Sequence, residues 1–149
     1  MSTKRIYLDV CVLCRIFDDQ TQARIKLETD ALSLILTYLR ETELEAVFSS
    51  VHNAEINAIR RAEEKAYLLL LLIELNSDYS VDNTIARQRA ENLAANGMGV
   101  ADAAHVAIAE LSNADFVSVD DRLLKQCLQL GVAVWSGSPL AYCVKENLR

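Results

Sequence analysis

The sequence predicts an α/β fold: a three-layer α/β/α sandwich with helices on both faces of a central, mostly parallel sheet. Two observations support this. Short segments with strand composition alternate along the chain with longer segments of helical periodicity, which is typical of βαβ units. The chain has 149 residues, close to the commonest size of one domain, and no linker, repeat or low-complexity block interrupts it. Residues 1–149 are therefore expected to form a single domain.

Four short segments have the composition of strands. Residues 5–9 (RIYLD) form the first, and residues 45–50 (EAVFSS) form the second, which is partly β-branched and aromatic. Residues 115–120 (DFVSVD) form the third, and like the first it runs from apolar residues into a carboxylate. Residues 132–135 (VAVW) are expected to be the last strand. Residues 76–82 are expected to form a turn, with room for a short strand.

The segments between these strands are predicted to be helical. The expected helices cover residues 20–40, 51–75, 83–97, 100–113 and 121–131. In the first helix, apolar residues recur at helical spacing with one polar interruption, Glu28. The second is expected to divide at a bend near residues 61–64. The expected caps are Asp19 or Thr21 for the first helix, Asn83 or Thr84 for the third and Asp121 for the last.

Composition and charge limit the classes of function. Hydrophobic residues make up 52% of the chain, and the net charge of −6 argues against a broad basic surface for duplex nucleic acid. An acidic chain is still compatible with a nuclease, because carboxylates around a metal ion contribute negative charge. The N-terminal residues do not resemble a signal peptide, so a cytoplasmic location with free cysteines is expected. The apolar run at 67–75 is too short to span a membrane and is expected to be a buried helix face.

Four acidic residues are predicted to meet at one edge of the sheet. Asp9 and Asp120 each end a strand, Glu55 lies near the start of the helix after the second strand, and Asp102 lies in the first turn of a later helix. Ligands of parallel α/β folds bind at the carboxyl ends of the strands. Clustered carboxylates repel one another, and a divalent cation relieves that repulsion. Oxygen ligands of this kind suit Mg²⁺ or Mn²⁺.

Other readings of the polar residues stay open at this point. Single acids near helix starts are commonly caps or partners of the helix dipole. Cys11 and Cys14 have the spacing of a redox or zinc motif, although small buried packing residues explain them equally simply. His52 and His105 each lie one helical turn from an acid, which is compatible with a mixed histidine and carboxylate metal site. The basic residues that could contact substrate phosphates are Arg15, Arg60, Arg61, Arg122 and Lys125.

Four blocks carry a family resemblance: IYLDVCVL, VFSSVHNAEINAI, GVADAAHVAIAE and DFVSVDDRLLK. In this order they resemble the PIN-domain family, which includes the VapC-type toxin nucleases of bacterial toxin–antitoxin pairs. The resemblance matches Asp9, Glu55, Asp102 and Asp120 to the four acids of the family. It also matches Ser118 to a supporting hydroxyl residue and gives His105 a structural or supporting role.

The resemblance implies a metal-dependent endoribonuclease that acts on RNA through Mg²⁺ or Mn²⁺, without a covalent intermediate. It further implies a homodimer and an antitoxin protein as partner, with no membrane association. The family often has hydroxyl or amide residues directly after the first acid, where this chain has Val10 and Cys11. Two alternatives therefore stay open: a binding or scaffold protein that keeps the fold without catalysis, and a histidine/carboxylate metallohydrolase acting on a small phosphate ester.

Overall fold

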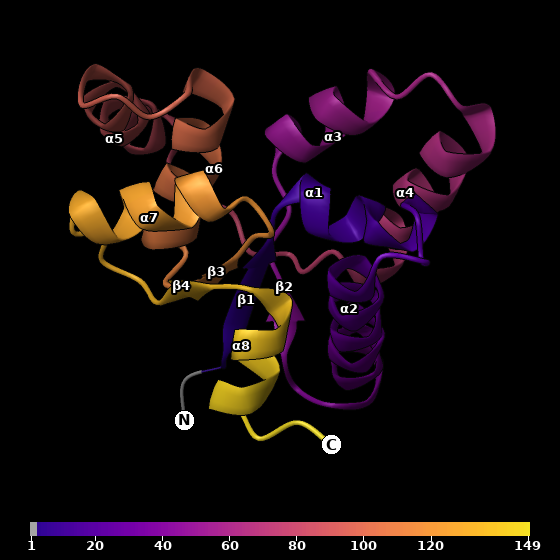
Figure 1. Ribbon diagram of the computed structural model, residues 1–149. Helices are drawn as coiled ribbons and strands as arrows, with labels where there is room; N and C mark the ends of the chain where they lie inside the picture. Colours follow the sequence, from indigo (N-terminus) through magenta and orange to yellow (C-terminus); the bar gives the residue numbers. More distant parts are fainter. Residues whose placement is uncertain (1–2) are drawn as a thin grey trace.

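A four-stranded parallel sheet forms the centre of the computed structural model, which describes residues 3–149 (Figure 1). The strands are β1 (Arg5–Leu8), β2 (Glu45–Ala46), β3 (Asp115–Val117) and β4 (Ser136–Gly137), and their order in the sheet is β2-β1-β3-β4. All three pairings are parallel. The predicted α/β/α fold class is therefore confirmed, with β1 and β3 as the central strands.

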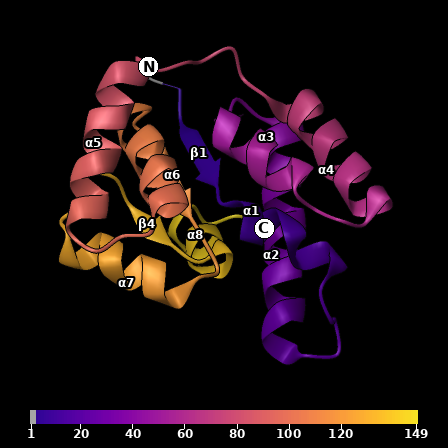
Figure 2. The ribbon, with the colours of Figure 1, turned by 90° about the horizontal axis from the view of Figure 1, so that it is seen from above.

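Helices surround the sheet. They are α1 (Val10–Leu13), the short 3₁₀ helix η1 (Cys14–Phe17), α2 (Ala23–Glu41), α3 (Ser50–Asn57), α4 (Ala62–Leu75), α5 (Asn83–Ala95), α6 (Val100–Leu111), α7 (Asp121–Gln129) and α8 (Pro139–Lys145). Figures 1 and 2 show α5, α6 and α7 on one side of the sheet and α2 and α4 on the other. The helix α8 packs against α2. Among residues 3–149, no helix combines the length and the apolar character that a membrane span requires.

Alternate side chains of β1 pack into two separate hydrophobic cores, as expected for a strand with helices on both faces. Ile6 and Leu8 belong to the core formed with α2, α4 and α8, whereas Tyr7 belongs to the core formed with α5, α6 and α7. All three side chains are fully buried. Because β1 is packed on both faces and paired on both edges, the residue that follows it, Asp9, leaves the sheet at a rigid point.

Most predicted helices are observed, with ends that differ by a few residues. The division of residues 51–75 into two helices is confirmed, since α3 ends at Asn57 and α4 begins at Ala62. The apolar run inside α4 is only partly a buried face. Leu68, Leu71 and Leu72 are buried, but Ile73 is exposed over 78% of its surface.

Several cap assignments were wrong. Asp120, and not Asp121, caps α7, because its side chain accepts a hydrogen bond from Leu123 N–H. Asp82 caps α5 in place of Asn83 or Thr84. The helix α2 follows Gln22 and has no side-chain cap, because Asp19 accepts instead from the N–H of Thr21 in the preceding turn.

The last strand and the last helix also differ from expectation. Residues 132–135 do not form β4: the N–H of Val132 closes the end of α7 by bonding to Cys127 O, and the strand starts one residue after Trp135. The helix α8 was not predicted from the sequence. Ser138 caps it and Pro139 occupies its first turn, a combination that favours helix initiation.

A buried histidine fixes the carboxyl end of β1. His52 on α3 donates from Nε2 to Leu8 O over 2.7 Å, and its Nδ1 accepts from the N–H of Ser49 over 3.0 Å. Burial lowers the pKa of His52 to about 3, and the nearby His105 acts in the same direction. Both ring nitrogens are therefore occupied in the neutral form, and His52 ties α3 to the strand end that precedes Asp9.

The low pKa of His52 predicts that the fold is acid-sensitive. An unfolded histidine titrates near pH 6.5, whereas folded His52 stays neutral down to about pH 3. The unfolded chain therefore binds an extra proton as the pH falls through this window. The free energy of unfolding should decrease by up to ~1.4 kcal/mol per pH unit on that account, while above about pH 6.5 the contribution is constant.

Urea unfolding between pH 7.5 and 4.5 measures this slope. Other titrating groups also contribute to it, so the informative quantity is the difference between the native protein and His52→Gln. The variant is expected to be less stable at neutral pH and to show a shallower loss on acidification. Parallel slopes in the two proteins would contradict the assignment of a buried neutral imidazole.

Candidate functional site

The four acids predicted from the sequence lie at the carboxyl edge of the sheet. Asp9 directly follows β1 and begins α1, and Asp120 follows β3 and begins α7. Glu55 is on α3, and Asp102 is in the first turn of α6. Figure 1 shows that α1, α3, α6 and α7 all meet beyond the ends of β1 and β3. Four separate segments of the chain therefore contribute carboxylates to one region.

Asp9 is almost fully buried and is held by a hydroxyl group. Its exposed fraction is 6%, and the hydroxyl of Ser118 donates to its Oδ2 over 2.8 Å. The same Ser118 Oγ accepts from the N–H of Asp120 over 3.1 Å. One serine at the end of β3 thus links the backbone of one acid to the carboxylate of another.

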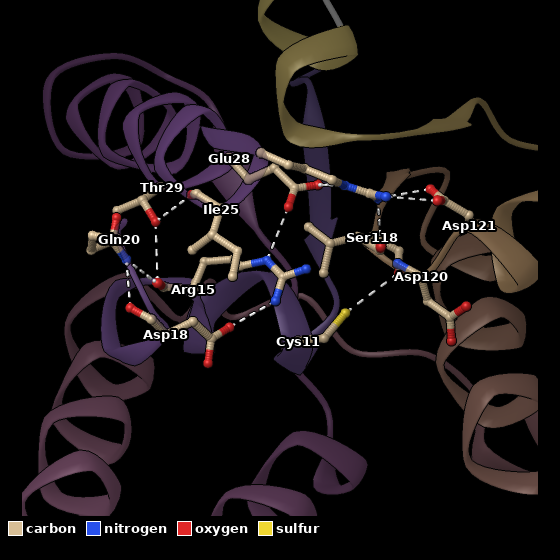
Figure 3. Close-up of polar contacts among 12 residues, drawn as sticks. Cys11, Arg15, Asp18, Gln20, Ile25, Glu28, Thr29, Ser118, Asp120 and Asp121 are labelled. Carbon is tan, nitrogen blue, oxygen red and sulfur yellow. Dashed lines mark hydrogen bonds and ion pairs between the residues drawn. The ribbon is translucent and has the colours of Figure 1, made fainter. Parts of the chain in front are cut away.

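Cys11 lies beside this pair and is not a reactive thiol. Its Sγ is 3.5 Å from Ser118 Oγ, as the close-up of Figure 3 shows. Burial, together with the charge of Asp9, raises the pKa of Cys11 to about 12, and burial raises that of Cys14 to about 11. Both cysteines are free. Because reactive and metal-binding cysteines need a lowered thiol pKa, the structure favours a packing role for both.

Glu55 is held from the interior by a histidine. His105 on α6 is fully buried, and its Nε2 bonds to Glu55 Oε1. Ligand atoms of Asp9, Glu55 and His105 all lie within 4.8 Å of one another, which makes them a candidate metal-binding group. The other ring nitrogen of His105 contacts the hydroxyl of Tyr7. A histidine with both nitrogens bonded is better placed to orient Glu55 than to bind a cation.

Asp102 and Asp120 complete the acidic region. The pKa of Asp102 is raised, first by burial and then by the negative charges of Asp9 and Asp120, although His105 acts in the opposite direction. Asp120 uses one carboxylate oxygen, Oδ1, to cap α7 through Leu123 N–H. A half-buried carboxyl that is destabilised by its acidic neighbours marks a position where a bound cation would lower the energy.

The residues at this edge fit a divalent metal ion. The donor set consists of hard carboxylate oxygens, which Mg²⁺ and Mn²⁺ prefer. Burial is the main cause of the raised pKa of Asp102, and the negative charges of Asp9 and Asp120 add to it. The metal would be held by the carboxylates of Asp9, Glu55, Asp102 and Asp120, with Ser118 and His105 orienting two of them.

One arginine braces the segment that carries Asp120 from outside the site. Arg24 on α2 donates to the carbonyl of Val119 over 3.1 Å and to both carboxylate oxygens of Asp121 over 2.8 Å. The residues before and after Asp120 are thus held by one guanidinium. Arg24 also donates to Glu28, which in addition accepts from Arg15 over 3.0 Å (Figure 3).

Three of these residues were missed or misread by sequence reasoning. Glu28 was only a polar interruption in an apolar stripe, yet it is buried and receives both arginines. A single acid on the apolar face of a helix was a usable signal, because such an acid needs a cationic partner. Arg15 was a candidate for phosphate contacts, but it is engaged by Glu28 and Asp18. Tyr7 gave no signal beyond its place in an apolar strand.

The Glu28 network predicts an unequal cost for removing two acids from α2. Glu28→Ala leaves two arginines without their shared partner and should lower the free energy of unfolding by roughly 2–4 kcal/mol, less than for a fully buried pair because Arg24 is exposed. Asp30→Ala breaks only the exposed pair with Lys26 and should change it by no more than about 0.5 kcal/mol. Urea denaturation of both variants makes the comparison, and equal small losses would show that the network does not stabilise the fold.

Comparisons with known proteins agree with this architecture. The family model described as PIN domain matches residues 6–127, a range that includes all four acids. FitAcB from Neisseria gonorrhoeae, a solved structure, is similar over 90% of this chain and 97% of that chain, with a TM-score of 0.53. The two share 17% sequence identity, so this likeness supports the fold alone. No curated protein sequence matches the chain. The match to the family model over most of its length shows that the chain belongs to the PIN domain family.

Proposed function

We propose that this PIN domain protein is a Mg²⁺- or Mn²⁺-dependent endoribonuclease that hydrolyses RNA phosphodiester bonds. The observation that carries the proposal is the position of Asp9, Glu55, Asp102 and Asp120 at the carboxyl edge of the sheet. Ligand atoms of Asp9, Glu55 and His105 lie within 4.8 Å of one another there. Burial raises the pKa of Asp102, and the charges of Asp9 and Asp120 raise it further. PIN domains are generally nucleases, and this acidic edge is the region of the chain with the donor set for that chemistry.

Three of the four acids have a distinct hydrogen-bond partner that supports them in the proposed reaction. Ser118 orients the carboxylate of Asp9, His105 orients Glu55, and Leu123 N–H orients Asp120. A divalent cation held by these acids would supply positive charge for the phosphodiester and lower the pKa of a bound water. Because Asp9, Glu55 and Asp120 are held before substrate arrives, little reorganisation of these three is needed at the moment of reaction.

Exposed cations near the acidic edge are proposed to contact RNA phosphates. Arg122 and Lys125 lie on α7 after Asp120, and Arg60 follows α3, the helix that carries Glu55. All three are exposed, and none takes part in an ion pair within residues 3–149. Arg61 pairs with Glu64 and is less available. Local cations of this kind attract phosphates even though the chain as a whole is acidic.

We further propose that the protein is the toxin of a toxin–antitoxin pair, with a homodimer as its own assembly and an antitoxin protein as its partner. The support is the resemblance of the four sequence blocks to the VapC-type members of the family. Co-expression with the product of the neighbouring gene, followed by purification through one tag, tests the partner. Light scattering of the protein alone tests the homodimer.

Asp9→Asn tests the metal site directly. The variant keeps an oxygen that accepts from Ser118, so the fold should be retained, but it removes one charge from the acidic cluster. Cleavage of a mixed RNA substrate in Mn²⁺ should fall by at least about a hundredfold, the scale of losing one electrostatic contribution in an active site. Asp30→Asn, which removes a charge from an exposed pair on α2, is the matched control and should cleave as the native protein does.

The other functions give different results in the same assay. Full activity of Asp9→Asn, or cleavage that survives a chelator, would refute the proposed site. Hydrolysis of a small phosphodiester without cleavage of RNA would favour the histidine/carboxylate metallohydrolase. A protein that cleaves neither substrate under any metal condition would be assigned as a scaffold.

Thermal unfolding gives a second test of the cation. A ligand that binds only the folded state stabilises it by about 2.7 kcal/mol at a concentration of 100 Kd. Millimolar Mn²⁺ should therefore raise the Tm of the native protein by several degrees, and the rise should be smaller in Asp9→Asn. An identical rise in both would mean that the ion binds elsewhere.

A further inference from the structure

A series of hydrogen-bonded polar groups, buried at its centre, runs from the start of α3 to the candidate site. Ser49 Oγ lies 2.8 Å from the hydroxyl of Tyr7, and that hydroxyl lies 2.5 Å from Nδ1 of His105. Nε2 of His105 bonds to Glu55. Tyr7 and His105 are fully buried, and they come from β1 and α6, elements 98 residues apart at this contact.

The direction of each hydrogen bond follows from its neighbours. A carboxylate can only accept, so Nε2 of His105 donates to Glu55 and carries the proton. In the neutral ring Nδ1 then accepts, and its donor is the hydroxyl of Tyr7. Because Tyr7 donates its only hydroxyl proton to His105, the hydroxyl of Ser49 donates to Tyr7.

Aromatic packing holds the ring of His105 in this orientation. Its centroid is 5.4 Å from that of Tyr7 and 4.8 Å from that of His52, with the rings close to perpendicular in both pairs. His52 is itself fixed by Leu8 O and Ser49 N–H. The imidazole of His105 therefore has little freedom to rotate, and the remaining variable is which nitrogen carries its proton.

We propose that Tyr7 is a positioning residue of the site: its hydroxyl donates to Nδ1 of His105, and this places the ring proton on Nε2, where it holds Glu55. His105 is then a hydrogen-bond donor to a metal-binding carboxylate and not itself a metal ligand. The proposal rests on the proposed function for the role of Glu55, whereas the assignment of the His105 proton stands on the contacts alone. Partners of this kind typically change metal affinity by 10–100-fold when removed.

The test compares Tyr7→Phe with Tyr79→Phe. Each variant removes one phenolic oxygen and keeps the ring. Tyr79 is a suitable control because its hydroxyl donates to a backbone carbonyl, that of Leu111, over 3.2 Å and does not enter the His105 chain. The protein has two histidines, so spectra of His52→Gln assign the remaining imidazole signals to His105.

Two readouts separate positioning from a general loss of stability. Nitrogen-15 chemical shifts of the imidazole report which nitrogen of His105 carries the proton, in the metal-free and Mg²⁺-containing protein. Calorimetric titration with Mn²⁺ reports metal affinity. Native protein should show a single Nε2–H form with or without Mg²⁺. Tyr7→Phe should show a mixture of forms and bind Mn²⁺ about tenfold or more weakly, while Tyr79→Phe should match the native protein.

Several outcomes would overturn the proposal. These are a native His105 protonated on Nδ1 or on both nitrogens, a direct shift of its Nε2 signal characteristic of metal coordination, or a Tyr7→Phe protein with unchanged shifts and affinity. The native spectra decide the first two even if Tyr7→Phe does not fold. If native protein binds neither Mg²⁺ nor Mn²⁺, the proposed function fails, yet loss of the Nε2–H form in Tyr7→Phe still supports the positioning role.

Discussion

Mutual repulsion among acidic side chains at one edge of a parallel sheet is the constraint on which the rest of the structure depends. Asp9 accepts a hydrogen bond from Ser118 at the end of β3, and Glu55 accepts one from His105 on α6. Asp120 accepts one from Leu123 N–H in the first turn of α7. Asp102, whose pKa is raised by burial and by its acidic neighbours, shows that these bonds do not remove the repulsion. The fold therefore keeps three of its acids in place with hydrogen bonds from hydroxyl, imidazole and backbone N–H groups, without pairing them to a lysine or arginine among residues 3–149.

The placement of the arginines follows the same logic. Arg24 reaches the segment on either side of Asp120, but it pairs with Asp121 and Glu28 and not with Asp120 itself. A guanidinium bound to Asp120 would neutralise a carboxylate that the site needs. The arginine thus secures the backbone while the functional carboxylate stays available, and the buried Glu28 balances the charge of the two guanidinium groups.

The features of the molecule that depend on local sequence pattern could be predicted. Alternating strands and helices predicted the sheet, and the rule that ligands bind at strand carboxyl ends predicted a common edge for Asp9 and Asp120. Contacts between segments that are distant in the chain could not be predicted from the sequence. Tyr7 meets His105 across 98 residues, and nothing in an apolar strand distinguishes a tyrosine with a buried partner from one that only packs. The strand β4 was predicted at the wrong residues because the N–H of Val132 bonds to Cys127 O and closes the end of α7.

The residues after Asp9 also take on a different meaning in three dimensions. Val10 and Cys11 lack the hydroxyl or amide that the family often has there, which counted against an active site as long as support was sought in the neighbouring sequence. The structure supplies a hydroxyl from the end of β3 instead, because Ser118 bonds to both Asp9 and the backbone of Asp120. Cys11, with its pKa raised to about 12, remains a neutral thiol against that serine and adds no charge to the acidic edge. A departure in the residues that follow β1 therefore does not by itself remove support for the acid, since parallel pairing of β1 with β3 places a second source of hydrogen bonds beside it.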